Sequence, residues 1–119
     1  MEVLKDPFDP KAGKKIKSKE AARWTKNYRT NPGKQEETLT LAHYFGKEFL
    51  LSILNEDACA GLRIYQAIDD EGASRLLVVG VDAKGKDLIS PIDDDGDGAV
   101  GDTPMMCPIN CDPNSPLMQ

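Results

Sequence analysis

The order of apolar and polar residues predicts two helices in the first half of the chain. In residues 18–30, Ala21, Trp24 and Tyr28 recur at helical spacing, and Trp24 is expected to anchor this helix in the core. A second helix is predicted over residues 41–55, whose apolar side chains form one broad stripe. The stripe consists of Leu41, Phe45, Phe49, Leu50, Ile53 and Leu54.

Residues 61–82 predict an antiparallel hairpin. The segment 61–68 alternates between two faces, as a half-buried strand does. Turn-forming residues fill positions 69–73, and the apolar run 75–82 follows, so these two strands are expected to pair. A third strand is predicted over residues 87–92. One face of the first strand holds Leu62, Ile64 and Ile68, and the other holds Arg63, Tyr65 and Ala67, which are expected to point away from the helices as a contact surface.

These elements together predict an α+β fold, with two helices packed on a small, mainly antiparallel sheet and an irregular C-terminal tail. The length of 119 residues suits one domain. Its expected parts are a flexible basic arm at residues 1–17, the α+β domain at 18–92, and an acidic, cysteine-containing tail at 93–119 that belongs to the same domain.

Charge is distributed unevenly along this chain, although its net charge is only −5. Residues 1–47 hold eleven Lys and Arg against six Asp and Glu, whereas residues 48–119 hold four against fourteen. The asymmetry either steers an acidic partner to the first segment or lets the two halves attract each other. Nucleic acid is disfavoured as that partner, because Trp24 and Tyr28 are expected in the core and the acidic remainder repels a polyanion.

Composition also predicts the cellular location of the protein. No apolar run approaches the roughly 18 residues that span a bilayer, and residues 1–19 lack the apolar stretch of a secretory leader. The sequence therefore predicts a cytoplasmic protein that does not bind membrane, and whose partner is an unknown protein or a second copy of the chain. The odd number of cysteines, three, predicts free thiols.

An acidic loop at residues 93–98 has the spacing of a calcium site. Asp93, Asp95 and Asp97 stand at alternate positions of such a loop, followed by a glycine that permits its sharp bend. Pro104 stands where an EF-hand has its bidentate glutamate, so the loop is not an EF-hand. Two alternatives stay open, a weaker Ca²⁺ loop completed by Asp102 and a solvated acidic turn.

Cys59, Cys107 and Cys111 form the second candidate metal set. A single C-x-x-x-C pair is a weak zinc pattern. His43 lies about 18 Å from the far end of the predicted second helix, so one metal is not expected to bind both His43 and Cys59. Three alternatives stay open. The three thiolates bind Zn²⁺ together with Asp57 or water, the thiols are free or packed, or a redox disulfide forms. The simplest interpretation is that Cys59 packs as a small hydrophobic residue.

The sequence assigns no catalytic residues. His43 is the only histidine, and no motif supplies it with a nucleophile. The leading interpretation is a non-enzymatic binding or accessory module with a candidate Ca²⁺ or Zn²⁺ site in its tail. The alternative is a small enzyme that uses His43 or a tail cysteine in a cleft.

Several short segments resemble a family of small uncharacterised bacterial proteins of unknown function. They are His43-Tyr44-Phe45-Gly46-Lys47-Glu48, Cys59-Ala60-Gly61-Leu62-Arg63-Ile64-Tyr65, Leu77-Val78-Val79-Gly80-Val81-Asp82 and Cys107-Pro108. The likeness covers about residues 20–83 and the cysteine tail, and the Asp-rich loop is not part of it. The resemblance implies no activity, ligand or catalytic residue.

Overall fold

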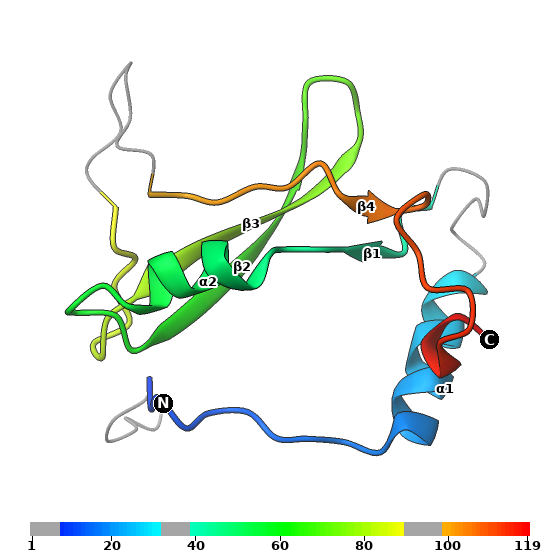
Figure 1. Ribbon diagram of the computed structural model, residues 1–119, viewed down its shortest axis with the longest axis horizontal. Helices are drawn as coiled ribbons and strands as arrows, with labels where there is room; N and C mark the ends of the chain where they lie inside the picture. Colours follow the sequence, from blue (N-terminus) through cyan, green and yellow to red (C-terminus); the bar gives the residue numbers. More distant parts are fainter. Residues whose placement is uncertain (1–7, 32–38, 90–98) are drawn as a thin grey trace. The chain divides into compact units, whose positions relative to one another are not determined.

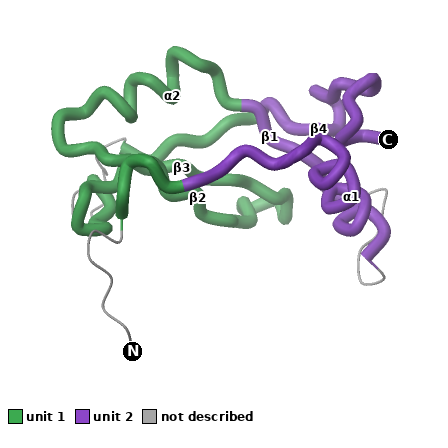
Figure 2. The backbone as a smooth tube through the Cα atoms, turned by 90° about the horizontal axis from the view of Figure 1, so that it is seen from below, with its two compact units in different colours: residues 1–12, 45–104 green, residues 13–44, 105–119 purple. Residues whose placement is uncertain are grey.

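The computed structural model describes residues 8–31, 39–89 and 99–119 (Figure 1). Its contacts divide the chain into two compact units (Figure 2). Unit 1 comprises residues 1–12 and 45–104, and unit 2 comprises residues 13–44 and 105–119. Within the described residues each unit contains an α-helix and a two-stranded antiparallel sheet, which confirms the predicted α+β class.

Unit 1 is built around the predicted hairpin. Strand β2 (Gly61–Ile68) pairs antiparallel with β3 (Ser74–Val81), in a register that places Ile64 opposite Val78. In the turn between them, the Asp69 carboxylate accepts the backbone N–H groups of Glu71 and Ala73, each at 2.9 Å. The Ala73 N–H, and after it the Arg75 side chain, hold the pKa of Asp69 below its ordinary value. Local turn chemistry therefore fixes the hairpin register.

Strand β3 is the buried centre of unit 1. Val78 and Val79 point to opposite faces, and each is only 2% exposed. On the edge of β3 that faces away from β2, Val78 exchanges two backbone hydrogen bonds with Gly101, and Gly80 accepts one from Leu88. The predicted third strand is wrong over the part that is described: residue 87 forms a single bridge to β3, residues 88–89 are not in a strand, and residues 90–92 lie outside the described chain.

Helix α2 (Lys47–Leu54) packs its apolar stripe against β3. The rings of Phe45 and Phe49 stack, with centroids 6.2 Å apart. Phe49 lies so close to Gly101 that a Cβ atom there would stand 2.5 Å from Phe49 Cζ and 2.9 Å from Val78 Cγ2. The helix, the strand and the segment around Gly101 therefore meet at a position where only a glycine fits.

The predicted second helix is wrong in its first half, because residues 42–43 form strand β1 and the helix begins only at Lys47. Gly46 adopts extended dihedral angles as the N-cap and separates the two elements. On either side of β1, the N–H groups of Leu41 and Tyr44 donate to carbonyls of Cys107 and Met105, both at 2.8 Å. This pairing with a segment some 60 residues away overrides the local helical period.

Unit 2 contains α1 (Ser18–Arg29), β1 (Ala42–His43), β4 (Met106–Cys107) and the short 3-10 helix η2 (Pro116–Met118). Helix α1 lies against η2, and both Thr25 Oγ1 and Arg29 Nη1 donate to the Leu117 carbonyl at 2.8 Å. Trp24 is 51% exposed, so its prediction as a core anchor is wrong. Helix α1 packs mainly against η2, which has only three residues and offers little surface to bury an indole.

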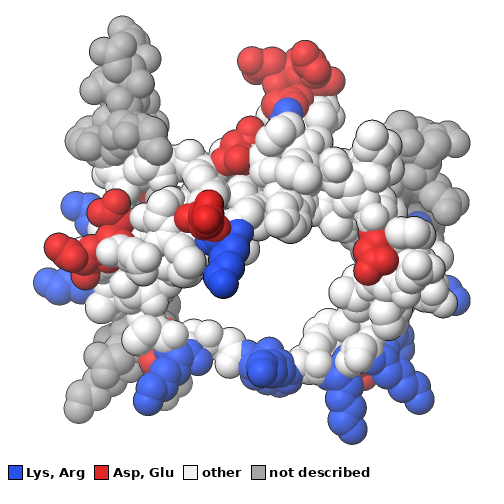
Figure 3. All heavy atoms as spheres, in the orientation of Figure 1, with Lys and Arg blue, Asp and Glu red and all other residues white. Residues whose placement is uncertain are grey.

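The charge asymmetry of the sequence coincides with the two units. Unit 2 has eight Lys and Arg against four Asp and Glu, whereas unit 1 has seven against sixteen. Figure 3 shows acidic side chains gathered at the tip of the β2–β3 hairpin and basic side chains along residues 11–29. In the part of the chain that the structure describes, no helix has the length and apolar character needed to cross a membrane.

Candidate functional site

A groove of about 630 Å³ opens in unit 1 where the end of α2 approaches β3. This volume lies within the usual range of small-molecule sites. We name it the α2 groove. Its described lining residues are Phe49, Ser52, Ile53, Glu56, Asp57, Ala58, Gly80, Leu88 and Ala99.

The floor of the α2 groove is apolar and depends on Gly80. A Cβ atom at this position would stand 3.1 Å from Cys59 Sγ and 3.2 Å from Ile53 Cγ2. Ile53 and Cys59 therefore pack directly against the backbone of β3 at a position where a larger residue would crowd them. The Cys59 thiol donates to the carbonyl of Gly61 at 3.2 Å, so it is satisfied locally and packs as a small hydrophobe.

The polar groups of the α2 groove lie at the C-terminal end of α2. Glu56 and Asp57 follow the C-cap residue Asn55, and no basic residue stands in the last turn of the helix. A helix C-terminus carries partial negative charge, which adds to that of the two carboxylates. The Ser52 hydroxyl donates back to the Phe49 carbonyl at 2.5 Å. The groove therefore offers a ligand apolar contacts and negative potential at one end.

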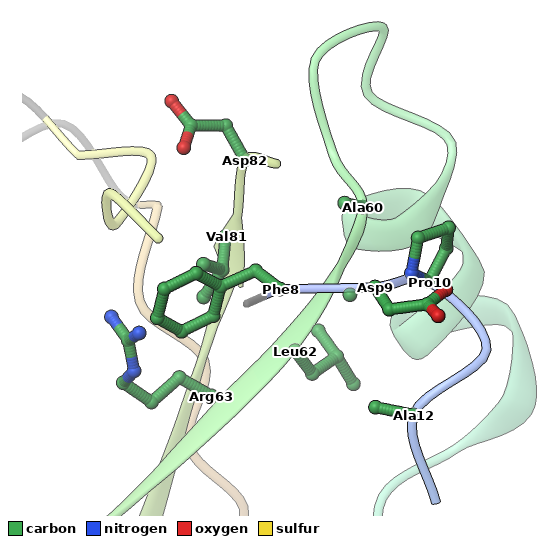
Figure 4. Close-up of a pocket in the computed structure, with 10 residues that line it drawn as sticks. Phe8, Asp9, Pro10, Ala12, Ala60, Leu62, Arg63, Val81 and Asp82 are labelled. Carbon is green, nitrogen blue, oxygen red and sulfur yellow. The ribbon is translucent and has the colours of Figure 1, made fainter. Parts of the chain in front are cut away.

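A second, smaller pocket of about 260 Å³ lies in unit 1 between residues 8–12 and the ends of β2 and β3 (Figure 4). Phe8 lies beside Arg63, whose guanidinium carbon is 5.3 Å from the ring centroid. The same ring lies over Gly85, where a Cβ atom would stand only 2.1 Å from Phe8 Cε2 and where φ is +88°. Gly85 is thus required both by the turn and by the aromatic ring above it.

The polar side chains beside this pocket form hydrogen bonds with one another. Asp87 accepts hydrogen bonds from Arg63 Nη1 and from the Tyr65 hydroxyl, each at 2.5 Å. The bond to Asp87 is the main cause that raises the pKa of Arg63 and also the pKa of Tyr65. Arg63 donates further to the Gly85 carbonyl at 3.1 Å. This face of β2 was predicted as a contact surface. In the structure, Arg63 and Tyr65 bond to Asp87 and so link β2 to the turn that follows β3.

The residues predicted for calcium fall mostly outside the described chain. Asp93, Asp95 and Asp97 lie in the segment 90–98, of which the structure gives no description. Asp102 is described, and its carboxylate lies 3.7 Å from Arg75 Nη1. Among residues 8–31, 39–89 and 99–119, no three His, Cys, Asp or Glu side chains gather into a metal-binding group.

Cys107 and Cys111 form a disulfide, so the prediction of free thiols is wrong for these two residues. Cys59 is not bonded to another cysteine. The predicted zinc set of three thiolates is therefore not formed in this oxidised state. Pairing is favoured locally, because the strand β4 ends at Cys107 and the following turn returns the chain, which brings the two Cα atoms within 4.8 Å.

His43, the base of the alternative enzyme interpretation, lies in β1 opposite Met106. It belongs to unit 2, as do Cys107 and Cys111, whereas Cys59 and the α2 groove belong to unit 1. Because the tail cysteines are joined to each other, neither supplies a nucleophilic thiol in this state.

Comparisons with protein-family models, with curated proteins and with solved structures give no match. The resemblance to small bacterial proteins therefore stays a prediction.

Sequence reasoning did not find the α2 groove, although one signal for it was present. Gly80 interrupts the apolar run 75–82, and a glycine inside a strand often marks a close approach or a missing side chain. Leu88 and Ala99 carry no comparable signal. They reach the groove only because the chain after β3 returns along its free edge, through the bonds at Gly80 and Gly101.

Proposed function

We propose that the protein is a non-enzymatic binding module whose α2 groove takes an apolar ligand with one positively charged end. The observation that carries this proposal is the composition of the groove, an apolar floor of about 630 Å³ with Glu56 and Asp57 at one end. An apolar body contributes affinity through burial, and an ammonium group gains from the carboxylates and from the end of α2. The hydroxyl of Ser52, the one hydroxyl of the described lining, donates to the Phe49 carbonyl of its own helix, which supports binding rather than nucleophilic catalysis.

The proposal predicts a ranking of three probes with the same hexyl chain: hexylamine, hexanol and heptanoate. Hexylamine is expected to bind most tightly and heptanoate most weakly, because the apolar chain is the same and the charge of the head group differs. Titrations followed by NMR are expected to move the backbone signals of Ile53, Ala58 and Gly80. Neutralising both carboxylates with Glu56→Gln and Asp57→Asn is expected to weaken hexylamine by about tenfold and to leave hexanol unchanged.

Two matched alanine-to-leucine substitutions test whether the probes bind in the α2 groove or elsewhere in unit 1. Ala58→Leu fills part of the groove and is expected to abolish binding of all three probes. Ala83→Leu adds the same side chain at an exposed turn position outside the lining and is expected to leave binding intact. Equal effects of the two substitutions, or an absence of shifts at the groove with every probe, would contradict the proposal.

We also propose that the tail binds Ca²⁺ at the site predicted from the sequence. Asp93, Asp95 and Asp97, with Asp102, are the expected Ca²⁺ ligands, since alternate carboxylates in a tight loop suit this cation. Native mass spectrometry of protein purified without added metal is expected to show one bound Ca²⁺ that is lost in the Asp95→Asn variant. Asp70→Asn, in the acidic hairpin turn, is the control. If the parent protein binds no ion, the proposed Ca²⁺ site is wrong.

The same proposal includes a cytoplasmic location. The Cys107–Cys111 disulfide weighs against it, since disulfides are typical of oxidising compartments. Nucleic acid stays disfavoured as a partner because unit 1 is acidic. The expected burial of Trp24 gives no further support, since Trp24 is exposed in the structure.

A further inference from the structure

Strand β2 has an outer edge whose backbone groups have no strand partner among the described residues. Both the N–H and the C=O of Val78 bond to Gly101, so they point away from β2. Val78 lies opposite Ile64, so these two residues form one of the non-hydrogen-bonded pairs of the antiparallel ladder. The N–H and C=O of Ile64 therefore point away from β3, as do those of Leu62, Gln66 and Ile68. No described strand other than β3 pairs with β2.

This edge lacks the features that usually prevent strands from associating. Exposed edges are commonly short, or carry lysine, proline or a bulge. Strand β2 has eight residues with no proline and a single charged residue, Arg63, which is bonded to Asp87. Two apolar side chains beside the edge are exposed, Ile64 at 58% and Ile68 at 77%. An edge of this length and composition is suited to pairing with another strand.

We propose that β2 pairs antiparallel with β2 of a second copy of the chain, about a twofold axis through Gln66. This register keeps every outward-pointing residue opposite another outward-pointing residue, so that a continuous ladder forms. It places Ile64 opposite the partner's Ile68 and Arg63 opposite the partner's Asp69. Moving the axis to residue 65 would set Ile64 against the partner's Gln66 and Arg63 against the partner's Ala67. The register through Gln66 alone matches apolar with apolar and cation with carboxylate.

The charges support a second copy as the occupant. Arg63 already pairs with Asp87, and Asp69 with Arg75. Across the axis these two ion pairs lie next to each other, so that charges alternate in sign at both ends of the interface. Like charges directly opposite each other would instead be destabilising. The interface uses neither Glu56 nor Asp57, so it does not depend on ligand binding in the α2 groove.

Hydrogen exchange at two protein concentrations tests both the interface and its register. The amides of Arg63, Tyr65 and Ala67 bond to β3, and they are expected to be protected at every concentration. The amides of Ile64, Gln66 and Ile68 are expected to gain protection only as the concentration rises. Sedimentation velocity on the same samples is expected to show a monomer–dimer equilibrium. A monomer throughout, or a dimer whose even-numbered amides stay unprotected, would overturn the proposal.

Three variants sharpen the test. Ile68→Lys sets a charge opposite an isoleucine at two symmetric positions and is expected to weaken dimerisation more than about tenfold. Gln66→Pro removes an N–H that the hairpin does not use, so dimerisation is expected to be lost while Arg63, Tyr65 and Ala67 keep their protection. Leu54→Lys changes an exposed apolar residue on α2 and is expected to leave the dimer unchanged. Retention of the dimer in both edge variants would also overturn the proposal.

Discussion

Replacing Gly101 with valine is expected to lower the free energy of unfolding by about 3 kcal/mol. The first added carbon would stand 2.5 Å from Phe49 Cζ and 2.9 Å from Val78 Cγ2, and Val78 is a fully buried residue of β3. The two further methyl groups of valine add volume at a position that is already too tight for one carbon. Chemical denaturation followed by circular dichroism measures the change.

Gly61→Val is the matched control for this substitution. A Cβ atom at Gly61 would meet nothing within 4 Å, and valine suits a strand position. Its effect is expected to stay within about 0.5 kcal/mol. In addition, Phe49→Leu is expected to restore part of the stability lost in Gly101→Ala, because it removes the ring atoms that the new methyl group meets. Equal losses in the two valine variants would show that the close approach at Gly101 is not what excludes a side chain.

Removal of the Cys107–Cys111 disulfide is expected to destabilise the β1–β4 pairing by about 2 kcal/mol, the value for a closed loop of this short length. Its effect is expected in unit 2, where Cys107 is 2% exposed and its carbonyl accepts the Leu41 N–H. The Cys107→Ala, Cys111→Ala double variant is therefore expected to speed exchange of the Leu41 and Tyr44 amides by about 30-fold.

Reduction of the parent protein with dithiothreitol is expected to give the same acceleration, since it opens the same loop without changing a side-chain volume. Cys59→Ala is the control, because Cys59 belongs to unit 1 and is not in the disulfide. Unchanged exchange of Leu41 and Tyr44 in both the double variant and the reduced protein would rule out a stabilising role for the disulfide.

The elements that sequence reasoning placed well are those whose signals are local. Strand β2 begins and ends where its alternation does, and α1 covers the segment with helical spacing. The first half of the second helix was placed wrongly because residues 41–45 fit a helical stripe as well as a strand. Only the pairing of β1 with β4 decides between them, and that pairing depends on residues 105–107.

The candidate site was less accessible to the same reasoning. Acidic and thiol clusters attract attention in a sequence because their chemistry is plain, yet Cys107 and Cys111 bond to each other. Three of the residues that line the α2 groove are small, namely Ala58, Gly80 and Ala99. Small residues give a weak sequence signal, and their positions in space depend on how the chain returns along β3. Of the two groove carboxylates, only Asp57 was considered as a site residue from the sequence, and only as a candidate zinc ligand.

The alternation of the two units along the chain sets an order for folding during synthesis. Residues 13–44 emerge from the ribosome early, but β4 and η2, the partners of β1 and α1, are made last. The hairpin and α2 of unit 1 come from one intervening stretch and have all their contacts available sooner. Unit 2 therefore cannot close until residues 105–119 are free, and a nascent chain halted before them displays an unsupported α1, a natural target for chaperones.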